Sequence, residues 1–243
     1  MMAPDGPRTV MVAGSTSEAG TAVVSALSGA GFRVAAVDLD TERVQNLAQS
    51  WPNVTGYTCN LAEPAAVREL ASTVRRDLGP LDGLIHLVGG WRGGDGIPGQ
   101  EDSDWDFLHT SVLTTLRNTS RAFYDDLEKS PAGRLAIVSA QAAANPSAGG
   151  AAYAAIKAAS EAWTLAVADG FRSSQSGSTD NRQPQRSAAV VFVVKALVDD
   201  KMKASQPDRK FPGFTHVKDL GAASAALFSR SAAELNGSRL PLV

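Results

Sequence analysis

The stretch Thr9-Val-Met-Val-Ala-Gly-Ser-Thr-Ser-Glu-Ala-Gly20 joins a short apolar run to the first amphipathic segment of the chain. The run from Thr9 to Ala13 is continuous, as in a strand that is buried on both faces. After Gly20, apolar residues recur at helical spacing, so a helix follows. Glycines at a strand-to-helix turn let the backbone approach a pyrophosphate, which the helix N-terminus then stabilises. The position predicts a nucleotide site, although any such turn can contain two glycines.

Strand and helix patterns alternate along the rest of the chain. We expect strands at 33–38, 54–59, 83–88, 135–139, 188–194 and 239–243, and helices at 41–50, 64–78, 103–127, 151–171 and 217–229. This predicts an α/β fold in which residues 1–243 form a single dinucleotide-binding domain. Its core is a doubly wound, Rossmann-type parallel sheet of about seven strands with helices on both faces. Residues 173–187 carry no apolar anchor and predict a flexible surface insertion within that domain.

Composition excludes several classes of protein. The 243 residues hold 23 basic and 25 acidic side chains, a net charge of −2, which gives no reason to expect nucleic acid or a membrane as partner. No apolar run approaches the roughly 20 residues of a membrane span, and the N-terminus lacks the basic region of a signal peptide. A lone cysteine, Cys59, and three scattered histidines predict no disulfide framework and no metal site. We expect a cytoplasmic protein.

Asp38 stands at the C-terminal end of the second predicted strand. A carboxylate there accepts both hydroxyls of an adenine ribose and repels a 2′-phosphate. The sequence has no Arg or Lys in the glycine loop or directly after Asp38, so NAD(H) is favoured over NADP(H). The alternative is that Asp38 begins a turn or caps the next helix.

Tyr153 and Lys157 are four residues apart on a predicted helix and therefore share a face. A neighbouring cation favours the ionised form of a phenol, so Lys157 is expected to lower the pKa of Tyr153 and also to bind a ribose. Tyr-x-x-x-Lys also occurs by chance in many helices, where it is merely a surface pair.

Taken together and in this order, the glycine turn, Asp38 and the Tyr153–Lys157 pair resemble the short-chain dehydrogenase/reductase family over nearly the whole chain. Locally, Val88-Gly-Gly-Trp-Arg-Gly-Gly94 resembles the Gly-Gly-Trp-x-Gly-Gly segment of the dihydropteridine reductases. The resemblance implies a reductase in which Tyr153 gives a proton to a small-molecule acceptor while NADH delivers hydride. It implies cofactor contacts at Gly14, Thr16, Ser17, Ala19, Gly20, Asp38, Asn60, Leu61, Val88, Gly89, Tyr153 and Lys157.

Several positions depart from the family pattern. Glu18 replaces the middle glycine of the first motif, His86-Leu-Val-Gly89 replaces Asn-Asn-Ala-Gly, and Val112 replaces the helix asparagine. Lys195-Ala196 stands where Pro-Gly is usual. We expect His86, which ends an apolar run, to be a satisfied core or rim histidine rather than a base.

The family's serine, which stabilises charge on the substrate oxygen, falls on Ala140. Candidate substrate contacts are therefore Trp91, the neighbouring Ser139 and Gln141, although a shift of one residue along a strand turns a side chain to the other face. Without the serine, a conjugated acceptor, quinonoid or pterin-like, is favoured over a simple ketone.

Two alternatives stay open. The missing motif positions are also compatible with a dinucleotide-binding sensor or oligomer partner that has no turnover, and with no cofactor at all if Glu18 repels the pyrophosphate. The helix with Lys157 is apolar nearly all round, which predicts burial on more than one side and a homodimer or homotetramer.

Overall fold

A parallel sheet forms the centre of the computed structural model, which describes residues 6–176 and 184–242. In these residues seven strands pair in the order β3-β2-β1-β4-β5-β6-β9, each parallel to its neighbours. Their bounds are β1 Thr9–Ala13, β2 Arg33–Asp38, β3 Val54–Thr58, β4 Gly83–His86, β5 Arg134–Ala140, β6 Ala188–Val194 and β9 Arg239–Pro241. The strand order reverses between β1 and β4, where doubly wound sheets open a crevice for a dinucleotide.

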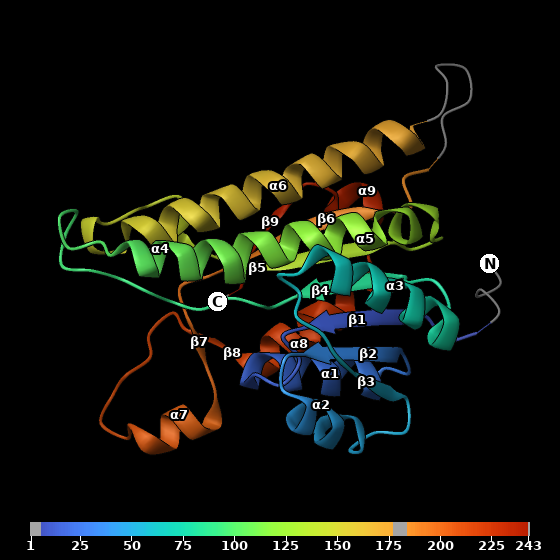
Figure 1. The fold of residues 1–243 in the computed structure, drawn as a ribbon, viewed down its shortest axis with the longest axis horizontal. Helices are drawn as coiled ribbons and strands as arrows, with labels where there is room; N and C mark the ends of the chain where they lie inside the picture. Colours follow the sequence, from blue (N-terminus) through green and yellow to red (C-terminus); the bar gives the residue numbers. More distant parts are fainter. Residues whose placement is uncertain (1–5, 177–183, 243) are drawn as a thin grey trace.

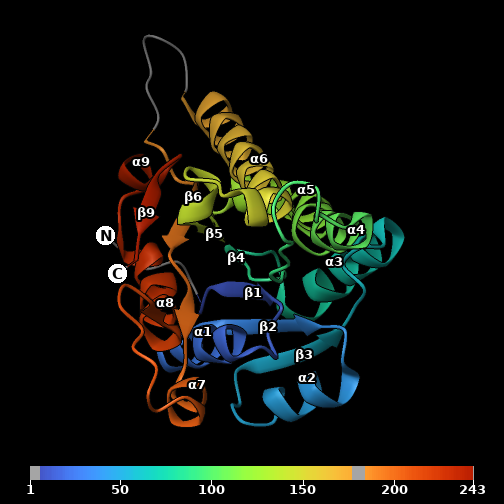
Figure 2. The ribbon, with the colours of Figure 1, turned by 90° about the vertical axis from the view of Figure 1, so that its left-hand side faces the viewer.

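Helices cover both faces of the sheet (Figures 1 and 2). One layer contains α1 (Glu18–Gly29), α2 (Thr41–Ala48) and α8 (Val217–Ala226), which pack on one apolar cluster. The other layer contains α3 (Pro64–Leu78), α5 (Thr115–Lys129) and α6 (Ala151–Gln175), which pack on a second cluster. All residues of β1 and β6 are buried, because the crossover helices shield both of their faces. The predicted single α/β domain with a seven-stranded parallel sheet is confirmed.

The predicted helix over 103–127 is interrupted. The chain forms α4 (Asp102–Leu108), then a π-helical segment, His109–Thr114, and then α5. The spacing of apolar residues does not distinguish a short π-helical segment from an α-helix, so the sequence predicted one continuous helix. Short π-helical segments are frequent at functional sites. Val112 of the π segment faces the cavity described below.

Four short elements that follow β6 were not predicted from the apolar periodicity of the sequence. They are β7 (Leu197–Val198), α7 (Asp200–Ser205), β8 (Thr215–His216) and α9 (Ala232–Leu235). Helix α7 has no buried residue, so it has no apolar stripe to find. The predicted strand 83–88 ends at His86, since Leu87 and Val88 already belong to the loop at the carboxyl edge of the sheet.

The insertion predicted at 173–187 is partly outside the described residues, because 177–183 are not among them. Its flanks are anchored: α6 continues to Gln175, whose buried side chain donates to Ser187 Oγ and accepts from the backbone amides of Arg186 and Ser187. None of the helices in the described part of the chain is both long and apolar enough to cross a membrane.

Candidate active site

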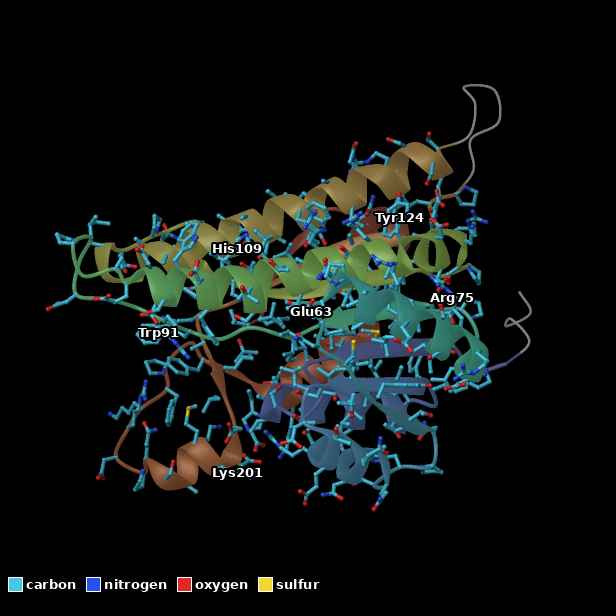
Figure 3. All side chains as sticks on the ribbon, in the orientation of Figure 1. Glu63, Arg75, Trp91, His109, Tyr124 and Lys201 are labelled. Carbon is cyan, nitrogen blue, oxygen red and sulfur yellow. The ribbon has the colours of Figure 1, made fainter. Side chains whose placement is uncertain are left out.

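A cavity of about 690 Å³ opens at the carboxyl edge of the sheet, between β4, β5 and the start of α6. Its floor comes from the ends of β4 and β5, and its sides from α6, the π segment and the chain after β6. The loop after β4 carries Trp91, whose side chain lines the cavity and is 66% exposed. Figure 3 shows Trp91 and Lys201 of α7 at the same end of the molecule.

Tyr153 and Lys157 both line this cavity from the first two turns of α6. Lys157 is buried, and its Nζ donates a 2.8 Å hydrogen bond to the carbonyl of Val138 on β5. The same nitrogen lies 5.7 Å from the centre of the Tyr153 ring. The structure therefore brings the two predicted residues together, with the lysine fixed to the sheet behind the tyrosine.

Burial governs the charge states of the pair. Loss of hydration lowers the pKa of Lys157 to about 8, although the Glu161 carboxylate opposes this shift. Burial also raises the pKa of Tyr153 above its ordinary value. The expected lowering of the tyrosine pKa by Lys157 is thus not found in this structure, where the ammonium is held on Val138.

The structure separates the two residues expected near the position of the missing serine: Ser139 lines the cavity, whereas Gln141 does not. Ser139 is buried and its hydroxyl donates a 2.6 Å hydrogen bond to Glu161 Oε1, so it is committed to α6. Gln141 is exposed in the short helical turn after β5 and lies outside the cavity lining. Ala140 does line the cavity, so a methyl group stands where the family has a hydroxyl.

The glycine loop between β1 and α1 is built for close approach. Gly14 has φ +81°, and a Cβ there would lie 3.0 Å from the backbone nitrogen of Val88. A Cβ on Gly20 would lie 2.2 Å from the carbonyl oxygen of Gly14, so only glycine fits. Ser17 caps α1 by accepting a 3.0 Å hydrogen bond from the Gly20 amide. This cradle at a helix N-terminus fits a pyrophosphate.

The carboxylate of Glu18 is paired with a cation in this structure. Its carboxylate forms a 2.6 Å ion pair with Lys201 of α7, a residue 183 positions away in sequence. The repulsion anticipated between Glu18 and a pyrophosphate is therefore opposed by a neighbouring cation. Sequence spacing gave no signal for this pair.

Asp38 faces a second cavity of about 450 Å³ that contains the residues expected around the adenosine. Its Oδ2 accepts 2.9 Å and 2.8 Å hydrogen bonds from the backbone nitrogen and the Oγ1 of Thr16. The fold also brings Arg43 to this place, because its Nη2 donates a 2.6 Å hydrogen bond to the carbonyl of Thr16. The sequence did not predict a cation close to Asp38, the residue expected to bind the adenine ribose. The described lining residues are Gly14, Asp38, Leu39, Cys59, Asn60, Leu61, Ala62, Val88, Asp106, Phe107, Thr110, Ser111 and Thr115.

Gln100 ties the loop after β4 to the start of α6, a link that the sequence did not reveal. Its Nε2 donates to the carbonyls of Gly96 at 3.0 Å and Gly149 at 3.2 Å, while its Oε1 accepts from the Ala152 amide at 3.1 Å. Because Ala152 precedes Tyr153, the side-chain amide of Gln100 connects the loop that forms the cavity wall to the helical turn that carries the tyrosine. Among the described residues, no three His, Cys, Asp or Glu side chains are grouped to hold a metal ion.

The fold and the two cavities define a doubly wound α/β protein with an open crevice at the carboxyl edge of its sheet. Sequence comparison gives its family: residues 8–175 match the family described as short chain dehydrogenase. The chain belongs to the short-chain dehydrogenase family of oxidoreductases.

Curated relatives match part of the chain. It is 27% identical over 161 residues to 2,3-dihydro-2,3-dihydroxybenzoate dehydrogenase of Bacillus subtilis, covering 65% of this chain and 61% of that protein. It is 33% identical over 105 residues to D-threitol dehydrogenase of Mycolicibacterium smegmatis, covering 41% of this chain and 39% of that protein. The chain thus matches less than two thirds of the length of either relative.

Solved structures share the fold. An NADPH-bound short chain oxidoreductase from Pseudomonas aeruginosa PAO1, described as containing an atypical catalytic center, superposes with a TM-score of 0.82 at 19% identity. This match covers 98% of this chain and 97% of that one. A short-chain dehydrogenase/reductase from Mycobacterium ulcerans gives a TM-score of 0.80 at 17% identity, covering 97% and 88% of the two chains.

Proposed function

We propose that the protein is an NADH-preferring reductase that acts on a small carbonyl or conjugated acceptor, with Tyr153 as proton donor. The observation that carries the proposal is the placement of Tyr153 and the buried Lys157 in one cavity beside the glycine cradle of α1. A buried lysine costs stability, and such groups cluster at functional sites.

The residues of this chain divide the work. A bound nicotinamide dinucleotide supplies the hydride. Tyr153 donates its phenolic proton to the substrate oxygen as negative charge develops there, and Lys157 stabilises the phenolate that is left. Val112, Leu116 and Val194 provide apolar walls, which exclude water and strengthen these electrostatic interactions.

The substrate class follows from Ala140. With a methyl group at this position and Ser139 bound to Glu161, we assign the donor to the substrate oxygen to Tyr153, one of the polar residues of the cavity lining. An acceptor that is already activated, quinonoid or pterin-like, needs less polarisation than a simple ketone. The exposed Trp91 ring in the cavity lining supports this choice, because an aromatic ring stacks favourably on a planar compound.

Asp38 supports NADH as the cofactor, since its carboxylate accepts ribose hydroxyls and repels a 2′-phosphate. Arg43 supports the other choice, because a guanidinium near the ribose binds phosphate. The solved neighbour from Pseudomonas aeruginosa binds NADPH. We give more weight to Asp38, which lines the cavity, than to Arg43, which is exposed and outside its lining.

Oxidation of NADH with a panel of quinones, dihydropterins and ketones tests the proposal. We expect turnover with the conjugated members, and a loss of about 100-fold or more in Tyr153→Phe, within the range of general acid catalysis. Turnover that survives Tyr153→Phe contradicts the assigned acid.

The competing function is dinucleotide binding without turnover, which the departures at Ala140, Val112 and Lys195 favour. Calorimetric titration with NADH separates it from the absence of cofactor. Binding combined with inactivity across the whole panel favours the sensor, whereas no heat of binding excludes both dinucleotide functions.

We also propose that the chain forms a homodimer or homotetramer through α6. The exposed residues Ala155, Ala158, Ala162 and Leu165 follow one another at helical spacing and form an apolar stripe on its outer side. Figure 1 shows α6 running along one side of the molecule. Sedimentation equilibrium tests this, and a monomer at micromolar concentration contradicts it.

A further inference from the structure

His86 has an unfilled hydrogen-bonding atom inside the main cavity. The residue ends β4, its side chain is only 4% exposed, and it lines the cavity together with Lys157. Its Nε2 has no hydrogen-bond partner within residues 6–176 and 184–242. No protein atom of the described residues thus satisfies the Nε2 of the side chain that was expected to be a satisfied core or rim histidine. A buried polar atom without a partner is unfavourable, so a bound ligand or water is expected at such an atom.

The surroundings of His86 favour a neutral ring. Burial is the largest cause that lowers the pKa of His86, to about 3, and the positive charge of Lys157 acts in the same direction. A hydrogen bond to the residue's own backbone opposes the shift. A neutral ring carries its proton on one nitrogen; with the proton on Nδ1, the unpartnered Nε2 keeps a lone pair that can accept a hydrogen bond.

The Lys157 ammonium can donate further hydrogen bonds. An ammonium group has three N–H donors, and one of them is bound to the Val138 carbonyl. The charged and titratable groups around it are His86 from β4 and Tyr153 and Glu161 from its own helix. Glu161 is already bound by Ser139 and by Arg239 of β9. Val112 and Leu116, on the side of the π segment and α5, are apolar.

We propose that His86 is a positioning residue, whose neutral Nε2 accepts a hydrogen bond from the Lys157 ammonium through one bound water. Such a water gains polar partners on both sides, as buried waters require. The acceptor holds the lysine charged in its apolar surroundings and directs it along the face of α6 that carries Tyr153. The inference rests on the proposed function, in which Lys157 acts on the tyrosine.

Nitrogen NMR of the protein without cofactor or substrate tests the first half of the proposal. The chain has three histidines, and the signals of His86 are assigned by their loss in His86→Gln. We expect a neutral ring protonated at Nδ1 down to pH 5. A ring protonated at Nε2, or one that titrates near 6.5, overturns the proposal. This result is independent of turnover, so it separates a failure of the inference from a failure of the proposed function.

Two substitutions test the role in the reaction. In His86→Gln the side-chain oxygen supplies an acceptor again, whereas His86→Leu fills similar space without one. We expect the alkaline fall of kcat/KM, set by deprotonation of Lys157, to move down by about half a pH unit in His86→Leu, a loss of about twofold at pH 8 that approaches threefold at higher pH. His86→Gln keeps the wild-type profile.

A merely structural role gives a different pattern. It predicts that the apolar leucine is tolerated as well as, or better than, glutamine, and that neither variant shifts the pH profile. Either result overturns the proposal. If His86→Leu does not fold, an unchanged alkaline limb in His86→Gln together with the Nδ1–H tautomer supports it, and a shifted limb in that variant contradicts it.

Discussion

The Ser139 hydroxyl donates a 2.6 Å hydrogen bond to Glu161 Oε1, across the interface between β5 and α6. Arg239 of β9 binds the same carboxylate at 2.8 Å. The serine nearest in sequence to the missing catalytic one therefore joins a buried carboxylate to the sheet. Lys157, one turn before Glu161, is bound to the residue that precedes Ser139. One polar cluster thus fixes the helix face on which the proposed catalytic pair stands.

Ser139→Ala is expected to lower stability and spare the chemistry. Loss of a buried hydrogen bond to a charged group reduces the free energy of unfolding by about 2 kcal/mol. The value of kcat stays within about twofold of wild type at a temperature where the variant is folded. Urea unfolding and NADH oxidation measure the two effects. Ser147→Ala, at the cavity lining but outside this cluster, is the control. A large fall in kcat with unchanged stability makes Ser139 a substrate contact after all.

The buried lysine makes stability depend on pH. The folded-state pKa of Lys157 is lowered from 10.5 to about 8, so between these values the unfolded chain binds a proton that the folded chain does not. Stability therefore rises with pH through this window, by about 3 kcal/mol for this group alone.

Lys157→Met removes that contribution, and comparison with wild type cancels the tyrosines that titrate at higher pH. We expect the difference in unfolding free energy between the two proteins to change by about 3 kcal/mol from pH 7 to pH 11, in favour of wild type. Parallel stability curves for the two proteins mean that Lys157 is hydrated in solution and not buried.

The sequence predicted what depends on local pattern. The strands, the glycine turn after Ala13 and the shared face of Tyr153 and Lys157 all follow from periods of a few residues. Strand alternation likewise predicts that Ser139 and Ala140 turn to opposite faces, although both residues line the main cavity.

Contacts between distant segments left no such pattern. The Glu18–Lys201 pair and the approach of Arg43 to Thr16 depend on how helices are placed around the sheet. The orphaned nitrogen of His86 depends on what surrounds a strand end in three dimensions. The sequence of a charged residue or a histidine is the same whether or not a partner lies beside its side chain in the folded protein.

The Glu18–Lys201 pair predicts a charge effect on cofactor binding. Lys201→Ala leaves the Glu18 carboxylate uncompensated at the N-terminus of α1, next to the cradle for the pyrophosphate. Because both side chains are substantially exposed, we expect a modest rise in the Kd for NADH, about two- to fivefold, that shrinks at high salt. Adding Glu18→Gln to Lys201→Ala restores the affinity. Lys203→Ala, on the same short helix, has no effect. If Lys201→Ala binds NADH as wild type does, the pair is only a surface contact.

Asp38 and Arg43 make opposite predictions for the cofactor, and one set of titrations decides between them. With Asp38 bound to the ribose hydroxyls, Asp38→Asn raises the Kd for NADH by about tenfold, as expected for the loss of a charged acceptor. Thr16→Val is the matched control, because it removes the 2.8 Å hydrogen bond within the loop but keeps the carboxylate. Arg43→Ala then leaves the Kd for NADH within about twofold. The opposite pattern, tighter binding of NADPH by wild type that Arg43→Ala abolishes, shows that the guanidinium overrides Asp38. In that case the aspartate serves to hold Thr16 and the loop, and its carboxylate must turn from the ribose when the phosphate binds.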